Sequence, residues 1–342
     1  MKSKINIDDI KHLPISRNVK SQKRTLVKSI TKYDKNTRDG LIICVVGRVY
    51  YVKDSINKIV FACDILGTIN SPYKKSSIAV VGDFVKFNIS EERNDDNLFL
   101  GSLVEVLERK SKLCRKSAGK ADREQVIASN IDLVVAFFSA ADPYYNRRLI
   151  DRYLVVAEEN NLEVIILVNK IDLMDLDFLK NDFKVYQELG YSVFFISLID
   201  EDNDINEFTN FLKNKNSIIT GPSGVGKSTF VNKIFGDEIQ VVGEISERTT
   251  KGQHTTSFVK LFNLPNGGNL VDSPGIREFG LWEFEKSELA LFFHDFDKYR
   301  DSCKYKSCTH SHEPSCSVIE AYNNKLIDSQ RYESYLSLFS SL

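Results

Sequence analysis

The sequence predicts a multidomain α/β protein of three successive parts, and three observations support this prediction. Residues 39–110 contain short alternating strand patterns, which are typical of a small β-barrel. Residues 111–282 contain continuous apolar strands that alternate with helical patterns, which indicates a doubly wound parallel sheet. Residues 283–342 return to a helical pattern around a cluster of cysteines. A chain of 342 residues is long enough for two or three such domains.

The first part has four apolar segments that we expect to form strands. Clusters of turn residues separate these segments. Four or five short strands favour the oligonucleotide-binding (OB) fold, although a purely structural barrel without a ligand fits the same pattern. The expected strands span residues 41–52, 59–63, 78–87 and 98–107.

The second part begins with a polar and basic segment, 111–125, that we expect to be a linker. Buried-strand runs and amphipathic helical faces alternate after it. The expected strands span residues 131–138, 164–168, 191–196 and 217–220, with helices near 149–157 and 205–212.

The N-terminal arm, residues 1–38, is strongly basic. It holds eleven Lys and Arg against three Asp and Glu, a net charge of +8, whereas the whole chain has a net charge of −1. We expect the arm to be flexible. RNA phosphate is the first candidate partner for such a run, and a solvated tail without a partner explains it equally well.

No apolar run approaches the roughly 18–20 residues of a membrane span, and no apolar signal core follows the start of the chain. We therefore expect a cytoplasmic monomer with no membrane partner. Cys44, Cys63 and Cys114 are scattered, which fits buried or inert thiols better than a disulfide framework.

A phosphate-binding loop, or P-loop, follows the expected strand 217–220 and opens a helix. Its glycines let backbone N–H groups face a phosphate, and the helix adds the positive end of its dipole. Lys227 is expected to reach the β- and γ-phosphates, and the Ser228 hydroxyl to bind Mg²⁺. The loop consists of Gly221, Pro222, Ser223, Gly224, Val225, Gly226, Lys227, Ser228 and Thr229.

An N-K-x-D motif follows the expected strand 164–168. An aspartate at its end can accept hydrogen bonds from N1–H and the 2-amino group of guanine, and adenine lacks both donors. By itself the motif is also an ordinary polar turn, but beside a P-loop it predicts GTP binding. Ser197 would lie in a third base-side loop, whose backbone N–H usually meets the guanine carbonyl. The motif consists of Asn169, Lys170, Ile171 and Asp172.

The base-reading motif precedes the P-loop, which reverses the order found in ordinary GTPases. This reversal indicates a circularly permuted GTPase domain. Permutation does not disturb the site, because the nucleotide loops lie at one end of the sheet in either order.

A second group of residues fits the magnesium side of such a site. Asp272 begins an Asp-Ser-Pro-Gly segment after a short strand and would face the ion. In the polar stretch upstream, Thr255 or Thr256 would complete the coordination of the Mg²⁺ ion. The γ-phosphate would order the loop that carries these two residues.

The group that orients the attacking water is less evident. Ile276 occupies the place where many GTPases have a glutamine, so intrinsic hydrolysis should be slow without a partner. His254 is the candidate catalytic residue, with Gln253 second. A surface histidine in a flexible loop is an equally good interpretation.

The C-terminal part has the spacing of a zinc site. Three thiols and an imidazole fall within fourteen residues, which matches a closed tetrahedral structural site. Metal binding would then supply much of the folding energy of this small part. His312 is a spare ligand that can compete with His310. The expected zinc ligands are Cys303, Cys308, His310 and Cys316.

Taken together, these motifs resemble those of the bacterial circularly permuted GTPases that depend on the small ribosomal subunit and act in its assembly. The resemblance runs from about residue 40 to the end of the chain. Leu198 departs from it, because a small residue usually follows the serine of the third base-side loop. The motifs span residues 81–83, 169–172, 221–229, 252–256, 272–280 and 331–336, together with the cysteine and histidine spacing.

The resemblance implies a GTP hydrolase that binds the small ribosomal subunit and its rRNA late in maturation and is stimulated by it. It also implies a role for the switch histidine in hydrolysis. We further hypothesise that the GTP state reaches the zinc-binding part through the short link 279–282. Two other functions are considered. The first is an RNA-bound placeholder with incidental hydrolysis. The second is a P-loop ATPase or small-molecule kinase, which the guanine motif disfavours.

Overall fold

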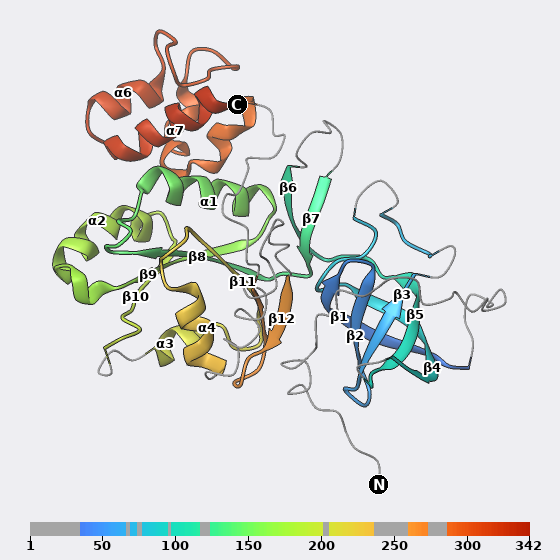
Figure 1. The fold of residues 1–342 in the computed structure, drawn as a ribbon. Helices are drawn as coiled ribbons and strands as arrows, with labels where there is room; N and C mark the ends of the chain where they lie inside the picture. The colour runs from blue at the N-terminus through green and yellow to red at the C-terminus, as the bar shows by residue number, and fades with distance from the viewer. Residues whose placement is uncertain are drawn as a thin grey trace, which may run out of the picture.

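The chain folds into a β-barrel, an α/β unit and a helical C-terminal module (Figure 1). The computed structural model describes residues 35–65, 69–73, 77–94, 97–116, 124–200, 205–235, 259–272 and 286–342. Within those ranges, none of the helices combines the length and apolarity that a membrane crossing requires.

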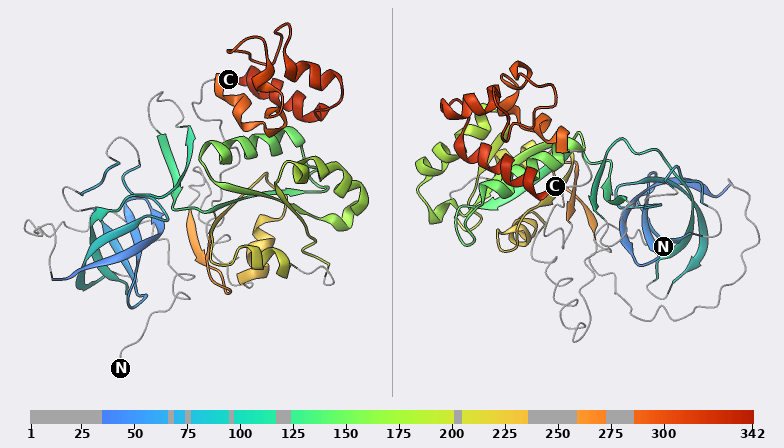
Figure 2. Two further views of the ribbon diagram at one scale, coloured as in Figure 1. Left: turned by 180° about the vertical axis from the view of Figure 1, so that it is seen from behind. Right: turned by 90° about the horizontal axis from the view of Figure 1, so that it is seen from above.

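Five strands form a closed barrel at the N-terminal side. They follow the order β1-β2-β3-β5-β4, and β4 pairs with β1 to complete the ring, which the right-hand view of Figure 2 shows end-on. Only β3 and β5 run parallel to each other, and this arrangement confirms the predicted OB-type barrel. The strands are β1 (Thr37–Val46), β2 (Val49–Asp54), β3 (Val60–Asp64), β4 (Phe84–Arg93) and β5 (Phe99–Val106).

Three details of the barrel differ from the sequence prediction. Thr37 and Arg38 lie in β1, although we assigned them to the arm, because their backbone pairs with β4. The expected strand 41–52 is a hairpin, since Gly47 adopts a φ of 61° and turns the chain between β1 and β2. The expected strand 78–87 begins only at Phe84, because residues 81–83 form a turn that packs against the next part of the chain.

That turn joins the barrel to the rest of the molecule. Gly82 lies so close to Ser129 that a Cβ atom would approach the Ser129 carbonyl oxygen to 2.1 Å. Asp83 is fully buried and accepts hydrogen bonds from Ser129 Oγ (2.6 Å) and from the Arg109 guanidinium (2.7 Å). Cys44 of β1 also pairs with Lys260 of β12, so one sheet continues from the barrel into the α/β unit.

The described ends of the expected linker 111–125 belong to two antiparallel strands, β6 (Lys112–Lys116) and β7 (Glu124–Ser129). The linker prediction was wrong there because the polar composition hid a few buried apolar side chains. Leu113 and Cys114 are almost completely buried, as are Val126 and Ala128 in the part of β7 beyond residue 125.

The α/β unit has the predicted doubly wound sheet, in the order β10-β9-β8-β11-β13-β12. The first five strands are parallel and β12 is antiparallel. Alternate residues of β8 face opposite sides, so Phe138 packs with α1 and α2 while Phe137 packs with α3 and α4. The strands are β8 (Leu133–Ser139), β9 (Glu163–Asn169), β10 (Ser192–Phe195), β11 (Asn216–Thr220), β12 (Lys260–Asn263) and β13 (Asn269–Asp272).

Helices cover both faces of this sheet, as Figure 1 shows. Three of them lie where the sequence predicts helices, whereas α2 was not predicted. The helices are α1 (Arg147–Glu159), α2 (Leu176–Glu188), α3 (Asn206–Phe211) and α4 (Lys227–Phe235).

The C-terminal module is helical, as predicted, and packs on α1 (Figure 2, left). Arg331 is 1% exposed and joins the two parts, with ion pairs to Asp151 of α1 (2.7 Å) and Asp295 of the module (2.6 Å). A buried Arg with two buried partners fixes the module against α1. The module contains η4 (Lys286–Phe292), η5 (His294–Phe296), η6 (Arg300–Ser302), α6 (Ser317–Asn323) and α7 (Ser329–Ser341).

Candidate nucleotide site and metal centre

The P-loop leaves the carboxyl end of β11 and turns into α4, as the sequence predicted. Gly221 lies against β8, where a Cβ atom would approach the Phe137 carbonyl oxygen to 2.0 Å. Gly224 and Gly226 have φ angles of 83° and 107°, which side chains strongly disfavour. The loop therefore requires glycine at these positions both for space and for conformation.

Lys227, the first residue of α4, points back over the P-loop. Its Nζ donates hydrogen bonds to the carbonyl oxygens of Gly221 (2.7 Å) and Pro222 (2.5 Å). Burial lowers the pKa of Lys227, and the nearby Asp272 carboxylate opposes that shift. An ammonium group desolvated in this way gains from a bound anion, which suits a ligand for phosphate.

Asn169 connects the base-reading motif to the P-loop. Its side chain is buried, and its Nδ2 donates a hydrogen bond to the Val225 carbonyl oxygen (2.9 Å). A Cβ atom on Gly226 would lie 2.3 Å from that same nitrogen. The two motifs, separated by about fifty residues in the chain, therefore contact each other directly.

Asp172 and Lys170 are held in place by neighbouring loops. Ser197 Oγ donates a hydrogen bond to Asp172 Oδ1 (2.5 Å), so the predicted third base-side loop reaches the base-reading carboxylate. Lys170 has a left-handed φ of 61°, and its Nζ donates to the Asp142 carbonyl oxygen. The backbone N–H of Ile171 donates a hydrogen bond to the Ile196 carbonyl oxygen (3.4 Å), which also ties the motif to the neighbouring strand end.

The described residues include only some of those predicted to bind Mg²⁺. Ser228 lies in the first turn of α4, and Asp272 ends β13, beside β11. Thr229 follows in α4. The switch residues His254 and Thr255, with their alternatives Gln253 and Thr256, lie outside the described residues, as does the link 279–282.

The predicted zinc ligands converge in the C-terminal module. The ligand atoms of Cys303, Cys308, His310 and Cys316 all lie within 4.8 Å of one another. Cys303 Sγ lies 3.5 Å from His310 Nδ1 and 3.7 Å from Cys316 Sγ. A tetrahedral zinc with its usual bond lengths has ligand separations of about 3.5–3.8 Å, so the geometry suits this ion.

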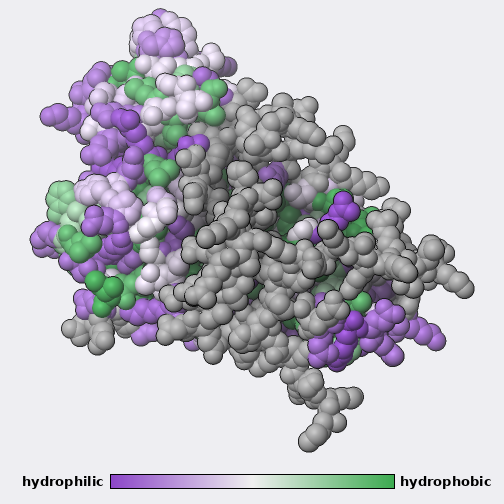
Figure 3. Space-filling view, viewed as in Figure 1, coloured by the Kyte–Doolittle hydropathy of each residue, from purple (hydrophilic) through white to green (hydrophobic). Residues whose placement is uncertain are grey.

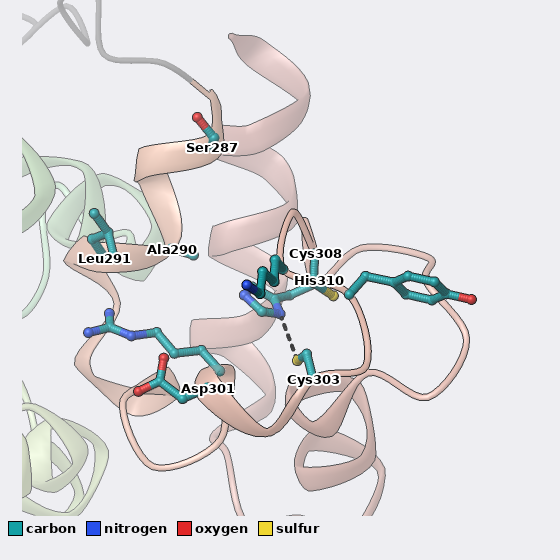
Figure 4. A pocket seen from close by; sticks show the side chains of 10 residues that line it. Ser287, Ala290, Leu291, Asp301, Cys303, Cys308 and His310 are labelled. Atoms are coloured by element: carbon teal, nitrogen blue, oxygen red, sulfur yellow. Dashed lines mark hydrogen bonds between the residues drawn. The ribbon is translucent and has the colours of Figure 1, made fainter.

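Other contacts support this cluster. Tyr332 of α7 donates its hydroxyl to the His310 carbonyl oxygen (2.8 Å), which fixes the loop that carries the imidazole. His312, the spare ligand, is not a member and instead contacts Ser311 Oγ (2.8 Å). Three of the four ligands, Cys303, Cys308 and His310, line a cavity of about 300 Å³. In Figure 4 the side chains of Cys303 and His310 point toward each other.

The sequence interval 106–282 matches the model of the RsgA GTPase family. The chain belongs to the RsgA GTPase family. It is accordingly a GTPase, and the reversed order of its two nucleotide motifs is a property that it shares with circularly permuted relatives.

Relatives of the RsgA GTPase family align with most of the chain. The small ribosomal subunit biogenesis GTPase RsgA of Chlorobaculum parvum is 38% identical, over 90% of this chain and 98% of its own length. The protein of the same name from Klebsiella pneumoniae is 35% identical, over 91% of this chain and 87% of its own.

Two solved structures have the same overall fold. YloQ, described as a circularly permuted GTPase, has a TM-score of 0.66 and 27% identity, and the match covers 92% of this chain and 97% of that one. YjeQ from Thermotoga maritima has a TM-score of 0.66 and 28% identity, covering 90% and 98%. These matches support circular permutation of the GTPase domain.

The structure adds residues that the sequence analysis missed. Asp142 supplies the carbonyl that holds Lys170, and Lys233 contacts the third base-side loop. Arg331 links the C-terminal module to the GTPase unit. No local pattern indicated these contacts, because each depends on a partner that is distant in the sequence.

Proposed function

We propose that this chain is a GTP hydrolase that binds the small ribosomal subunit and acts late in the maturation of that subunit, with hydrolysis stimulated by it. The direct contact between Asn169 and the P-loop carries the nucleotide part of the proposal, because it brings a base-reading loop to a phosphate loop. The names of the relatives support the ribosomal part. They also favour the enzyme over an RNA-bound placeholder.

Each residue of the nucleotide site has a proposed role. The backbone of residues 221–226 surrounds the β-phosphate, and Lys227 moves from its carbonyl partners to the phosphates when GTP binds. Asp172 accepts from guanine N1–H and the 2-amino group, and Ser197 orients its carboxylate. Ser228, Thr255 and Asp272 would hold Mg²⁺, which neutralises charge that develops during phosphoryl transfer.

His254 remains the proposed catalytic group on sequence grounds, since it follows the P-loop helix in a polar stretch. A neutral imidazole there can orient or deprotonate the attacking water. The C-terminal cluster is proposed to bind one structural Zn²⁺ through three thiolates and His310, which leaves no coordination position for a reaction. We also propose that the protein acts in the cytoplasm as a monomer, with rRNA as the partner of its basic arm.

Multiple-turnover GTP hydrolysis with and without purified small ribosomal subunits tests the function. We expect the turnover number to rise at least tenfold when subunits are added, and His254→Ala to abolish most of the stimulated rate. GTP binding without any stimulation would support the placeholder instead. Absence of GTP binding would refute the nucleotide site itself.

A further inference from the structure

The third base-side loop, residues 197–200, is held at two points. On one side, Ser197 Oγ contacts Asp172 and also accepts a hydrogen bond from the Asp200 backbone N–H (3.2 Å). On the other side, Lys233 Nζ donates to the Leu198 carbonyl oxygen (3.0 Å). The backbone between Ser197 and Asp200 is therefore fixed both to the base-reading carboxylate and to the helix that follows the P-loop.

Lys233 is well placed for this contact. It lies in α4, two turns beyond Lys227, and its side chain spans from that helix to a loop 35 residues earlier in the chain. A lysine side chain with one defined acceptor at 3.0 Å makes a charge-assisted hydrogen bond. Lys233 thereby links the phosphate side of the site to its base side.

The Leu198 side chain strengthens the same link. It is 8% exposed and packs in a cluster with Val225 of the P-loop and Val231 of α4. Its Cδ1 lies 3.5 Å from the position that a Cβ atom on Gly226 would occupy. Leucine, larger than the small residue usual at this position, fits here because Gly226 leaves the space open, and burial of its side chain fixes the position of the Leu198 Cα atom.

We propose that Lys233 is a positioning residue for guanine recognition. By holding the Leu198 carbonyl, it fixes the peptide that joins Leu198 to Ile199. Together with the contact at Ser197 on the other side of Leu198, this holds the loop backbone so that the Leu198 N–H faces the 6-oxygen of the base. Adenine has an amino donor at this position, so a correctly aimed N–H rejects it while it accepts guanine. This inference rests on the proposed function, because it assumes that the site binds a guanine nucleotide.

Binding of three diphosphates tests the proposal through competition against a fluorescent GDP analogue. GDP and IDP both carry the 6-oxygen, and IDP lacks only the 2-amino group, whereas ADP carries the 6-amino group. We expect Lys233→Met to weaken GDP and IDP by about three- to tenfold each and to leave ADP unchanged, which lowers the preference for guanine. Lys233→Arg should restore most of the loss, since it keeps a charged donor of similar reach.

Lys213→Met is the matched control, because Lys213 is also exposed but lies before β11, away from the carboxyl end of the sheet. It should bind all three nucleotides as the unchanged chain does. If Lys233→Met lowers the affinities for GDP, IDP and ADP equally, Lys233 has a merely structural role and the proposal is overturned. If no affinity falls, the proposal is overturned as well. Failure of the unchanged chain to prefer GDP over ADP would instead refute the guanine site itself.

Discussion

Gly226 and Asn169 fit together where the phosphate loop meets the base-reading loop. Gly226→Ala would place a methyl group 2.3 Å from Asn169 Nδ2, against a side chain that is itself fixed by Val225. We expect GTP affinity to fall at least tenfold in this variant, because the two loops must separate to make room. Titration with a fluorescent GTP analogue measures the change.

Gly190→Ala is the control for this variant. Gly190 has a φ of 95°, comparable with 107° at Gly226, but a Cβ atom there would meet nothing within 4 Å. Both substitutions carry a similar backbone penalty of about 1 kcal/mol, so only the clash differs. Equal affinity losses in the two variants would show that backbone strain, and not loop contact, explains the effect.

Asp172 determines which base the site accepts, in our proposal. In Asp172→Asn the acceptor facing the 2-position becomes a donor, which suits the carbonyl of xanthine instead of the amino group of guanine. We expect GTP affinity to fall about 100-fold and xanthosine triphosphate affinity to rise. Retention of full GTP preference, measured by calorimetry, would place the base reader elsewhere.

Two of the ion pairs between α1 and α7 differ strongly in burial. Arg331 pairs with Asp151 where the two side chains are 1% and 0% exposed, whereas Arg148 approaches Glu333 at 3.8 Å where they are 59% and 55% exposed. Arg331→Met would leave two buried carboxylates unpaired and should cost about 3–5 kcal/mol. Arg148→Met should cost less than about 1 kcal/mol. Urea unfolding of both variants checks this contrast, and similar costs would contradict it.

The pH dependence of the same interface follows from His294. The hydrogen bond to Glu158 of α1 raises the pKa of His294 to about 9, with Asp297 as a second partner. Because the folded pKa lies above the usual value, this stabilisation is complete at low pH and is lost as the pH rises through 9.

The stability difference between the unchanged chain and His294→Gln should therefore shrink from about pH 7 to about pH 10. Thermal unfolding of both forms across this range measures the difference. If the stability difference between the two forms stays constant with pH, the imidazole stabilises the fold independently of its charge.

At the scale of the elements, the sequence predicted those strands and helices that a local pattern specifies. The buried strands, the P-loop and the helix after it all follow from apolar runs and glycine spacing. Helix α2 had a readable signal as well, since Leu179, Phe183 and Tyr186 recur on one face and Asp175 caps its first turn. The pair of β6 and β7 was not readable, because polar residues flank the short apolar run of each strand and the pairing partner was not known.

The candidate site was predictable to a similar degree. Motif spacing predicted the base-reading loop, the P-loop and the cysteine cluster, since each set is close in sequence, and the structure brings the two loops together and the four cluster residues together. It did not indicate Lys233, and it gave Arg331 only as part of a family motif, without the contact to Asp151; the partners of these two residues lie 35 and 180 residues away. Contacts of that kind depend on the tertiary arrangement of the elements, which no local pattern specifies.

At the scale of the whole molecule, the C-terminal module docks on helix α1, which in turn contacts α2. Arg331 reaches Asp151, which also accepts from Tyr186 of α2. Helix α2 begins directly after the base-reading motif. The module is thus connected through Asp151 to the helix that follows the base-reading motif, in addition to the chain segment 279–282 through which we hypothesised coupling.

Zinc removal should affect this module before the rest. Its core mixes aliphatic and aromatic side chains, Phe296 and Tyr332 contact the segment that carries His310, and α7 is the one described element of the module with more than seven residues. We expect a chelator, or Cys308→Ser, to expose the module to protease while the barrel and the α/β sheet stay resistant. Mass spectrometry of the fragments locates the cuts, and cleavage that begins in the barrel would contradict this order.

The pairing of Cys44 with Lys260 has one more consequence. Strand β12 is the last strand of the α/β sheet, and the barrel covers its outer side. Without the barrel, β12 would present unpaired backbone groups to any other chain in solution. A fragment that begins at residue 111 should therefore self-associate at concentrations where the full chain stays dispersed, and light scattering would detect the larger species.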